Sequence, residues 1–185
     1  MLTITYSLGW GLAMGTTAMI ARRVGEGDND GASVSAVQSI YLALIISVPI
    51  MLCGIFFSED LLRLMGATNE VISEGSGYTK LTLGFNLIVI LLFLINGIFR
   101  GAGDAALAMR SLWIANSINI VLDPMLIFGV GPFPELGIEG AAIATIIGRS
   151  FGIIYQLYHL GKGKGLIKIH KDNWHFKPII IWKLI

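Results

Sequence analysis

The sequence predicts an all-α membrane protein, a polytopic helical bundle of five transmembrane helices plus the start of a sixth. Hydrophobic residues make up 55% of its 185 residues and charged residues 14%, against roughly 25% charged in an ordinary soluble domain. The apolar runs approach the roughly 20 residues that a helix needs to cross the hydrocarbon core. They show no recurring alternation of apolar and polar residues, which favours a helical bundle over a barrel.

Each predicted span is an apolar run, and short polar turns rich in Gly and Asp separate most of them. The longest loop, Ser58–Lys80, carries an amphipathic stretch, Glu59–Met65, that we expect at the membrane interface. A sixth span begins near Pro178, after a linker over residues 161–177. Because both ends lie in apolar sequence, we expect a partial chain, either a natural fragment or a truncated gene model. The five spans are residues 2–20, 34–57, 81–99, 112–130 and 138–160.

Loop charges predict the orientation of these spans. Residues 21–33, 100–111 and 161–177 together hold nine Lys and Arg residues, whereas 58–80 and 129–139 hold two. Cytoplasmic loops carry the excess of positive charge, so we place the first group in the cytosol. The chain is then a multi-pass protein of the cell inner membrane, surrounded by the lipid bilayer, and the span over 112–130 runs outward.

Asp123 is the only acidic residue inside the apolar run Ser111–Val130. A carboxylate at the centre of a membrane helix costs roughly 2.5–3.5 kcal/mol, and such residues normally face a cavity and mark a functional site. Asn119 lies one turn earlier on the same helical face. Pro124 lacks an N–H group and so leaves the carbonyl of Ile120 without its helical partner, which predicts a kink. These groups together favour a site for a small cation or a proton in the outer half of the span.

Other polar residues in the spans allow a structural interpretation. Asn86 and Asn116 are better explained as hydrogen-bonding links between helices, although Asn116 shares an arc with Asn119 and Asp123 and could line a cavity. Glycines one turn apart, such as Gly11 with Gly15 and Gly97 with Gly101, predict close helix packing.

Arg149, four residues after Thr145 in the last complete span, has two possible roles. It pairs with Asp123, since buried charges are seldom left unpaired, or it faces a water-filled vestibule. We favour the vestibule slightly, because a permanent ion pair would keep the pKa of Asp123 low and make it a poor proton carrier.

Several classes of function find no support in the sequence. The spans hold no Ser/His/Asp arrangement and no paired carboxylates, so we expect a protein that is not an enzyme and has no catalytic residues. The three histidines lack the spacing of a metal site, and no basic–aromatic pattern indicates nucleic-acid binding. Asp28–Gly31 lacks the full spacing of a calcium loop and is better interpreted as the polar start of a helix.

Four sequence segments resemble, in order, those of the multidrug and toxic compound extrusion (MATE) transporters. Residues 21–28 (ARRVGEGD) resemble a cytosolic loop of that family, and residues 96–104 (NGIFRGAGD) resemble the end of its helix 4. Residues 119–124 (NIVLDP), followed by Phe128 and Gly129, resemble helix 5, and residues 137–145 (GIEGAAIAT) resemble the start of helix 6. The resemblance covers nearly the whole chain.

The resemblance implies a fold of two pseudo-symmetric six-helix lobes, of which this chain would supply helices 2 to 6 of the N-terminal lobe. It implies a cation-coupling site in which Asp123 and Asn119 are the helix-5 pair, Asn96 contributes from helix 4 and Thr145 from helix 6. The helix-1 residue that completes the pocket and the whole second lobe, which transport requires, are not in this chain.

The function that the resemblance implies is export of drugs or other toxic compounds, coupled to the movement of H⁺ or Na⁺. Apart from this coupling ion, we expect no cofactor. The expected substrate is a small organic cation, and Asp123 is expected to take up the coupling ion from the outer side. Two alternatives remain: a lipid-linked oligosaccharide flippase of the same superfamily, and a non-transporting membrane protein in which Asp123 and Arg149 form a structural pin.

Overall fold

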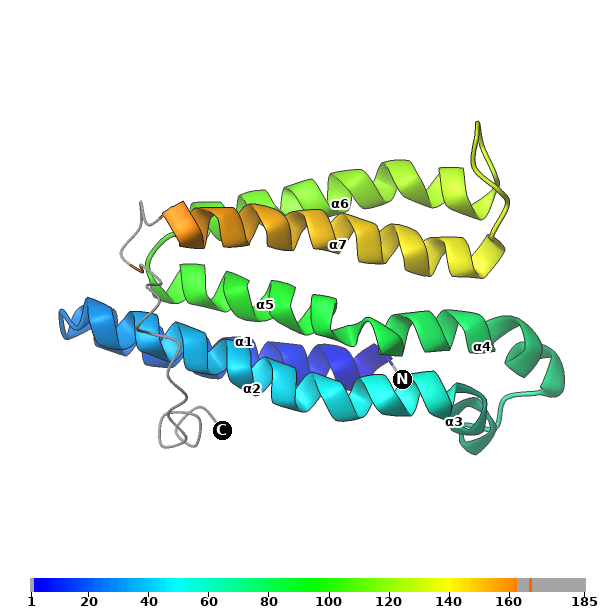
Figure 1. The fold of residues 1–185 in the computed structure, drawn as a ribbon, viewed down its shortest axis with the longest axis horizontal. Coiled ribbons are helices and arrows are strands. Elements are labelled where there is room, and N and C mark those ends of the chain that lie inside the picture. Colours follow the sequence, from blue (N-terminus) through cyan, green and yellow to red (C-terminus); the bar gives the residue numbers. More distant parts are fainter. Residues whose placement is uncertain (1, 163–166, 168–185) are drawn as a thin grey trace.

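The computed structural model describes residues 2–162 and residue 167. Apart from residue 167, these residues form seven helices joined by short connections. Most helices lie roughly parallel to the long axis of the molecule, with α6 beside α7, α4 and α5 in the middle, and α1 beside α2 (Figure 1). The helices are α1 (Leu2–Gly25), α2 (Asn29–Phe56), α3 (Ser58–Leu64), α4 (Asn69–Gly84), α5 (Asn86–Gly101), α6 (Ala105–Ile127) and α7 (Gly137–Lys162).

Helix α5 is the centre of the bundle. Its Ile90, Leu94 and Ile98 are fully buried, and it packs against α1, α2, α6 and α7. On the outer surface, large apolar side chains such as Trp113 and Ile120 are 68% and 70% exposed. Large exposed apolar side chains of this kind are what a protein surrounded by lipid presents.

Three helices of the described chain, α2, α6 and α7, are each long and apolar enough to cross a membrane. The pair α4 and α5 adds a fourth span if it is taken as one bent segment. Helix α1 is 24 residues long but is not among them; hydroxyl residues and glycines interrupt its apolar sequence. The predicted five spans therefore include one, α1, that its hydropathy alone does not establish.

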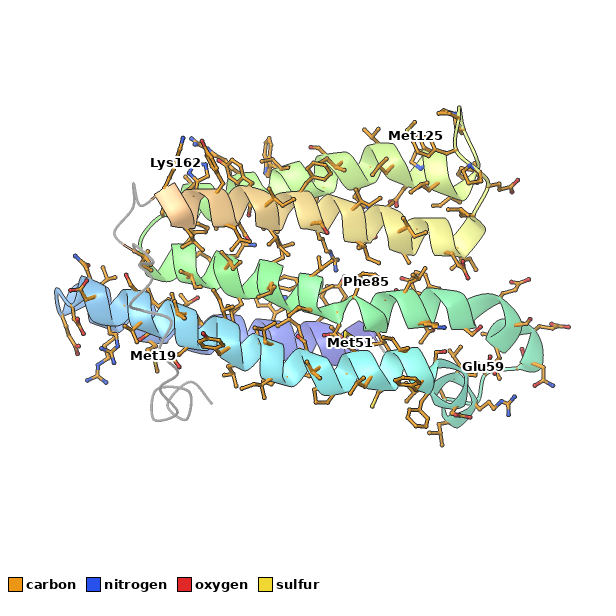
Figure 2. The ribbon with its side chains drawn as sticks, in the orientation of Figure 1. Met19, Met51, Glu59, Phe85, Met125 and Lys162 are labelled. Atoms are coloured by element: carbon orange, nitrogen blue, oxygen red, sulfur yellow. The ribbon has the colours of Figure 1, made fainter. Side chains whose placement is uncertain are left out.

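The third predicted span, residues 81–99, differs from the structure. Helix α4 ends at Gly84, α5 begins at Asn86, and the two axes meet at 43°; Phe85 marks the bend (Figure 2). The Asn86 side chain Nδ2 donates to Leu83 O at 2.6 Å, at the break, and to Ser47 O of α2 at 3.2 Å. Much of the predicted polar loop 58–80 is likewise helical, because α3 and the first part of α4 occupy it.

The polar helix start predicted at Asp28 is confirmed. Asp28 is the N-cap of α2: its Oδ1 accepts from the Gly31 N–H at 2.8 Å, and Arg23 donates to Oδ2. The Gly31 N–H bond, with Arg23, holds the pKa of Asp28 below its ordinary value. Most of the linker over residues 161–177, and the sixth span near Pro178, lie outside the described residues.

Close helix contacts occur at Gly97 and Gly101, as predicted. A Cβ atom at Gly97 would lie 2.7 Å from the Ala13 carbonyl oxygen of α1, and one at Gly101 would lie 2.8 Å from that of Thr17. At Gly11, by contrast, an added Cβ would meet nothing within 4 Å. The α1–α5 contact therefore depends on the glycines of α5.

Candidate functional site

Asp123, Asn119 and Thr145 form one polar group between α6 and α7, which we call the carboxylate cluster. The Asn119 Nδ2 atom donates to Asp123 Oδ1 at 3.0 Å and to Thr145 Oγ1 at 3.3 Å. All three side chains are partly buried. The structure thus brings together three of the residues that sequence and resemblance assign to a cation-coupling site.

The close approach of α6 and α7 positions this cluster. A Cβ atom at Gly148 of α7 would lie 2.6 Å from the Ala115 carbonyl oxygen and 3.3 Å from Asn119 Cβ. Because Gly148 has no side chain, the α6 backbone packs directly on α7 at this level. Asn119 therefore reaches Thr145, one turn before Gly148.

Pro124 lies inside α6, and the helix continues past it to Ile127. Its ring nitrogen carries no hydrogen, so the carbonyl of Ile120 has no partner at the usual i+4 position. That carbonyl lies within one turn of Asp123. Asp123, Asn119 and the carbonyl of Ile120 therefore lie along a single stretch of α6.

Asn96 is not part of the carboxylate cluster. Its Oδ1 accepts from Ser111 Oγ at 3.0 Å and from Gln156 Nε2 at 2.9 Å, and Gln156 Nε2 also donates to Ser111 Oγ at 2.9 Å. These three residues, the amide cluster, are almost completely buried between α5, α6 and α7. Ser111 lies twelve residues before Asp123 on α6, or roughly 18 Å along the helix at 1.5 Å per residue. The expectation that Asn96 contributes to the Asp123 pocket is therefore corrected.

Gln156 and Ser111 were not singled out from the sequence. The sequence does contain a feature that identifies Gln156. It is an amide inside an apolar run, and it lies seven residues after Arg149 on the same face of α7. Two atoms of the amide cluster, Asn96 Nδ2 and Gln156 Oε1, are buried and have no hydrogen-bond partner among the described residues.

Arg149 does not pair with Asp123. Its Nη2 donates to the Tyr6 hydroxyl of α1, and its guanidinium carbon lies 5.3 Å from the centre of the Tyr6 ring. The two ion pairs found within the described residues are Arg22–Glu26 and Arg23–Asp28, both near the α1–α2 turn. The structural pin considered from the sequence is therefore not formed here, and Arg149 instead lines a cavity that Thr145 also lines.

Asn116 belongs to neither cluster. Asn116 is exposed on α6, and its side chain makes no hydrogen bond with the described part of the chain. Within that same part, no group of three or more His, Cys, Asp or Glu side chains could hold a metal ion.

The chain is similar to a family of known proteins. The MatE family model matches residues 1–125. An FAD transporter of Shewanella oneidensis is 33% identical over 143 residues, covering 77% of this chain and 32% of the relative. A probable multidrug resistance protein of Bacillus subtilis is 28% identical over 170 residues, covering 92% and 36%. The chain thus spans about a third of the length of these relatives.

The solved structures agree with the sequence comparisons. An inward-facing multidrug resistance MATE family transporter of the MOP superfamily superposes with a TM-score of 0.88 at 32% identity. That match covers 97% of this chain and 40% of the solved one. The helical arrangement described above is therefore that of one part of a larger transporter fold.

Proposed function

Because this chain belongs to the MatE family of multi-pass membrane proteins, we propose that it forms part of a cation-coupled antiporter, and not of an enzyme. The whole protein would export drugs or other small organic compounds across the cell inner membrane in exchange for H⁺ or Na⁺. One observation carries the proposal: the carboxylate cluster holds an ionisable side chain inside a membrane helix, without a basic partner among the described residues.

The chemistry of the cluster suits a small cation. Asp123 Oδ1 accepts the Asn119 hydrogen bond, and Oδ2 makes none within the described chain. Carboxylate, hydroxyl and carbonyl oxygens are the ligands that a hard cation prefers, whereas a proton needs only the carboxylate. Asp123 would therefore bind either coupling ion, and the Asn119 amide oxygen and the Thr145 hydroxyl would add ligands for Na⁺.

Exchange follows from competition for one carboxylate. The ionised Asp123 binds a cationic group of the substrate and receives a charge-assisted hydrogen bond from Asn119. When H⁺ or Na⁺ neutralises Asp123, the substrate loses its counter-charge and the bond to Asn119 weakens. Asn119 also holds Thr145 of α7, so neutralisation alters the α6–α7 contact and favours the rocking of one lobe against the other.

The alternatives are less well supported. A structural pin needs an Asp123–Arg149 contact, and Arg149 instead bonds to Tyr6. A lipid-linked oligosaccharide flippase finds no specific support in the cluster geometry. The compared relatives include an FAD transporter and a probable multidrug resistance protein, which supports export of small organic compounds.

The test uses the full-length protein in proteoliposomes with an imposed H⁺ or Na⁺ gradient. We expect Asp123→Asn to lower gradient-driven efflux of the cationic dye ethidium at least tenfold, because the amide neither titrates nor carries charge. The matched control is Asp60→Asn, which makes the same chemical change at an exposed position of α3 and should transport at the wild-type rate. Efflux by Asp123→Asn at the control rate would overturn the proposal.

A further inference from the structure

A small cavity of about 90 Å³ is lined in part by Phe85. Phe85 lies at the bend between α4 and α5 (Figure 2). Helices α1, α4, α5 and α7 contribute the other lining side chains. Thr145 lines the cavity and also accepts the Asn119 hydrogen bond, so the cavity adjoins the carboxylate cluster. The polar lining residues are Tyr6, Tyr78, Thr82, Thr145 and Arg149.

Arg149 is the single charged residue among the described residues that line this cavity. A guanidinium has five N–H donors, and the structure shows one hydrogen bond, from Nη2 to Tyr6. No carboxylate of the described chain lies within ion-pair distance of it. A partly buried cation without a counter-charge is costly in a membrane protein, and its remaining donors are available to an anionic group.

The arginine is held in position before any ligand arrives. The Tyr6 hydroxyl accepts from its guanidinium, and the Tyr6 ring lies under the guanidinium carbon at 5.3 Å. Tyr6 in turn packs edge to face on Phe93 of α5, with ring centres 5.8 Å apart. Such a pre-organised guanidinium binds the two oxygens of a carboxylate or phosphate in a geometry that a flexible lysine does not reproduce.

The size of the cavity limits what it binds. A volume of about 90 Å³ is well below the roughly 300–1,000 Å³ of a pocket that holds a drug-sized molecule. That is enough for one carboxylate or phosphate group and too little for a whole drug-sized molecule. The cavity therefore recognises one substituent, while the rest of the compound lies elsewhere along the transport path.

Resting on the proposed transport function, we propose that Arg149, positioned by Tyr6, binds an anionic group of the exported compound. The neighbouring Asp123 binds its cationic group, so the favoured substrate carries both charges. This changes the expectation of a simple organic cation, because the guanidinium repels a second positive group and attracts a negative one. Exchange at Asp123 is unaffected, since the coupling ion still competes only with the cationic group.

The experiment uses two dyes that differ by one charge: tetramethylrhodamine, which carries a carboxylate, and its methyl ester, which does not. Binding of each dye to the purified full-length protein is measured by fluorescence anisotropy, and efflux is measured in proteoliposomes. We expect Arg149→Gln to weaken binding of the carboxylate dye about tenfold or more, the effect of losing a charge-assisted hydrogen bond. Binding of the ester should change less than about twofold.

Two further variants, Arg149→Lys and Asp123→Asn, distinguish a failure of the Arg149 proposal from a failure of the antiporter proposal. Arg149→Lys retains the charge and should restore part of the affinity for the carboxylate dye; it also serves if Arg149→Gln fails to fold. Equal losses for both dyes, or no loss for either, would overturn the role of Arg149. Because binding is measured without a gradient, a failure of coupled transport in the wild-type protein would count against the antiporter proposal alone. Asp123→Asn should weaken binding of both dyes.

Discussion

At the scale of single residues, Asn119 connects the two helices of the carboxylate cluster. One amide nitrogen donates both to the Asp123 carboxylate in its own helix and to the Thr145 hydroxyl of α7. A change in the charge of Asp123 therefore changes a hydrogen bond that Thr145 shares. Asn116, one turn earlier on α6 and chemically identical, is exposed and makes no such link within the described residues.

This difference predicts the effect of removing each amide. In the full-length protein, Asn119→Leu should lower gradient-driven efflux of ethidium at least tenfold, because Asp123 and Thr145 lose their common partner. Asn116→Leu should stay within about twofold of wild type. Initial efflux rates, normalised to the amount of protein in the membrane, give the comparison. Similar rates for the two variants would contradict the role of Asn119.

At the scale of the helices, the packing of α1 on α5 depends on glycine. The carbonyl oxygens of Ala13 and Thr17 occupy the space that Cβ atoms at Gly97 and Gly101 would need. A longer side chain at either position forces the two backbones apart. The same kind of contact at Gly148 holds α6 against α7 and so brings Asn119 to Thr145.

Gly97→Ala should therefore destabilise the folded protein by about 1–3 kcal/mol, the usual cost of overpacking. Gly11→Ala makes the same change on the facing helix α1, where the added methyl meets nothing within 4 Å, and should leave stability unchanged. Thermal unfolding of the purified full-length variants in detergent measures both. A Gly97→Ala midpoint equal to that of Gly11→Ala would show that the α1–α5 contact adjusts without cost.

At the scale of the whole molecule, the connections lie at two opposite ends of the bundle. The α1–α2 and α5–α6 turns lie at one end and the α6–α7 loop at the other (Figure 1). Lys162 and Glu59 lie near these same opposite ends (Figure 2). The described parts of the loops that the charge count assigns to the cytosol therefore lie at the same end, as alternate crossings of a membrane require.

Cysteine labelling measures the orientation. With the native Cys53 replaced in a Cys53→Ser background, Glu135→Cys should react with a membrane-impermeant maleimide on intact cells. Asp30→Cys, near the α1–α2 turn, should react only after the membrane is permeabilised. Both original residues are exposed. The side of the membrane on which each cysteine lies therefore determines whether it reacts with the maleimide. The opposite pattern would reverse the orientation and place the outer half of α6 towards the cytosol.

Features that depend on neighbours along the chain were predictable from the amino-acid sequence alone. The helical class follows from long apolar runs, and the pairing of Asn119 with Asp123 follows from their spacing of four residues. The capping role of Asp28 is local for the same reason. These contacts form within one helix or one turn, where bond geometry sets the distances.

The contacts between helices required the tertiary structure. Asn96 forms hydrogen bonds with Ser111 and Gln156 and is far from Asp123. Arg149 donates a hydrogen bond to Tyr6, 143 residues away in the chain. The chain bends between α4 and α5 at Phe85. The contacts of Asn96 and Arg149 depend on how far one helix slides and rotates against another. Close packing at positions such as Gly97 and Gly148 sets that shift, and residue spacing along a single helix contains no information about it.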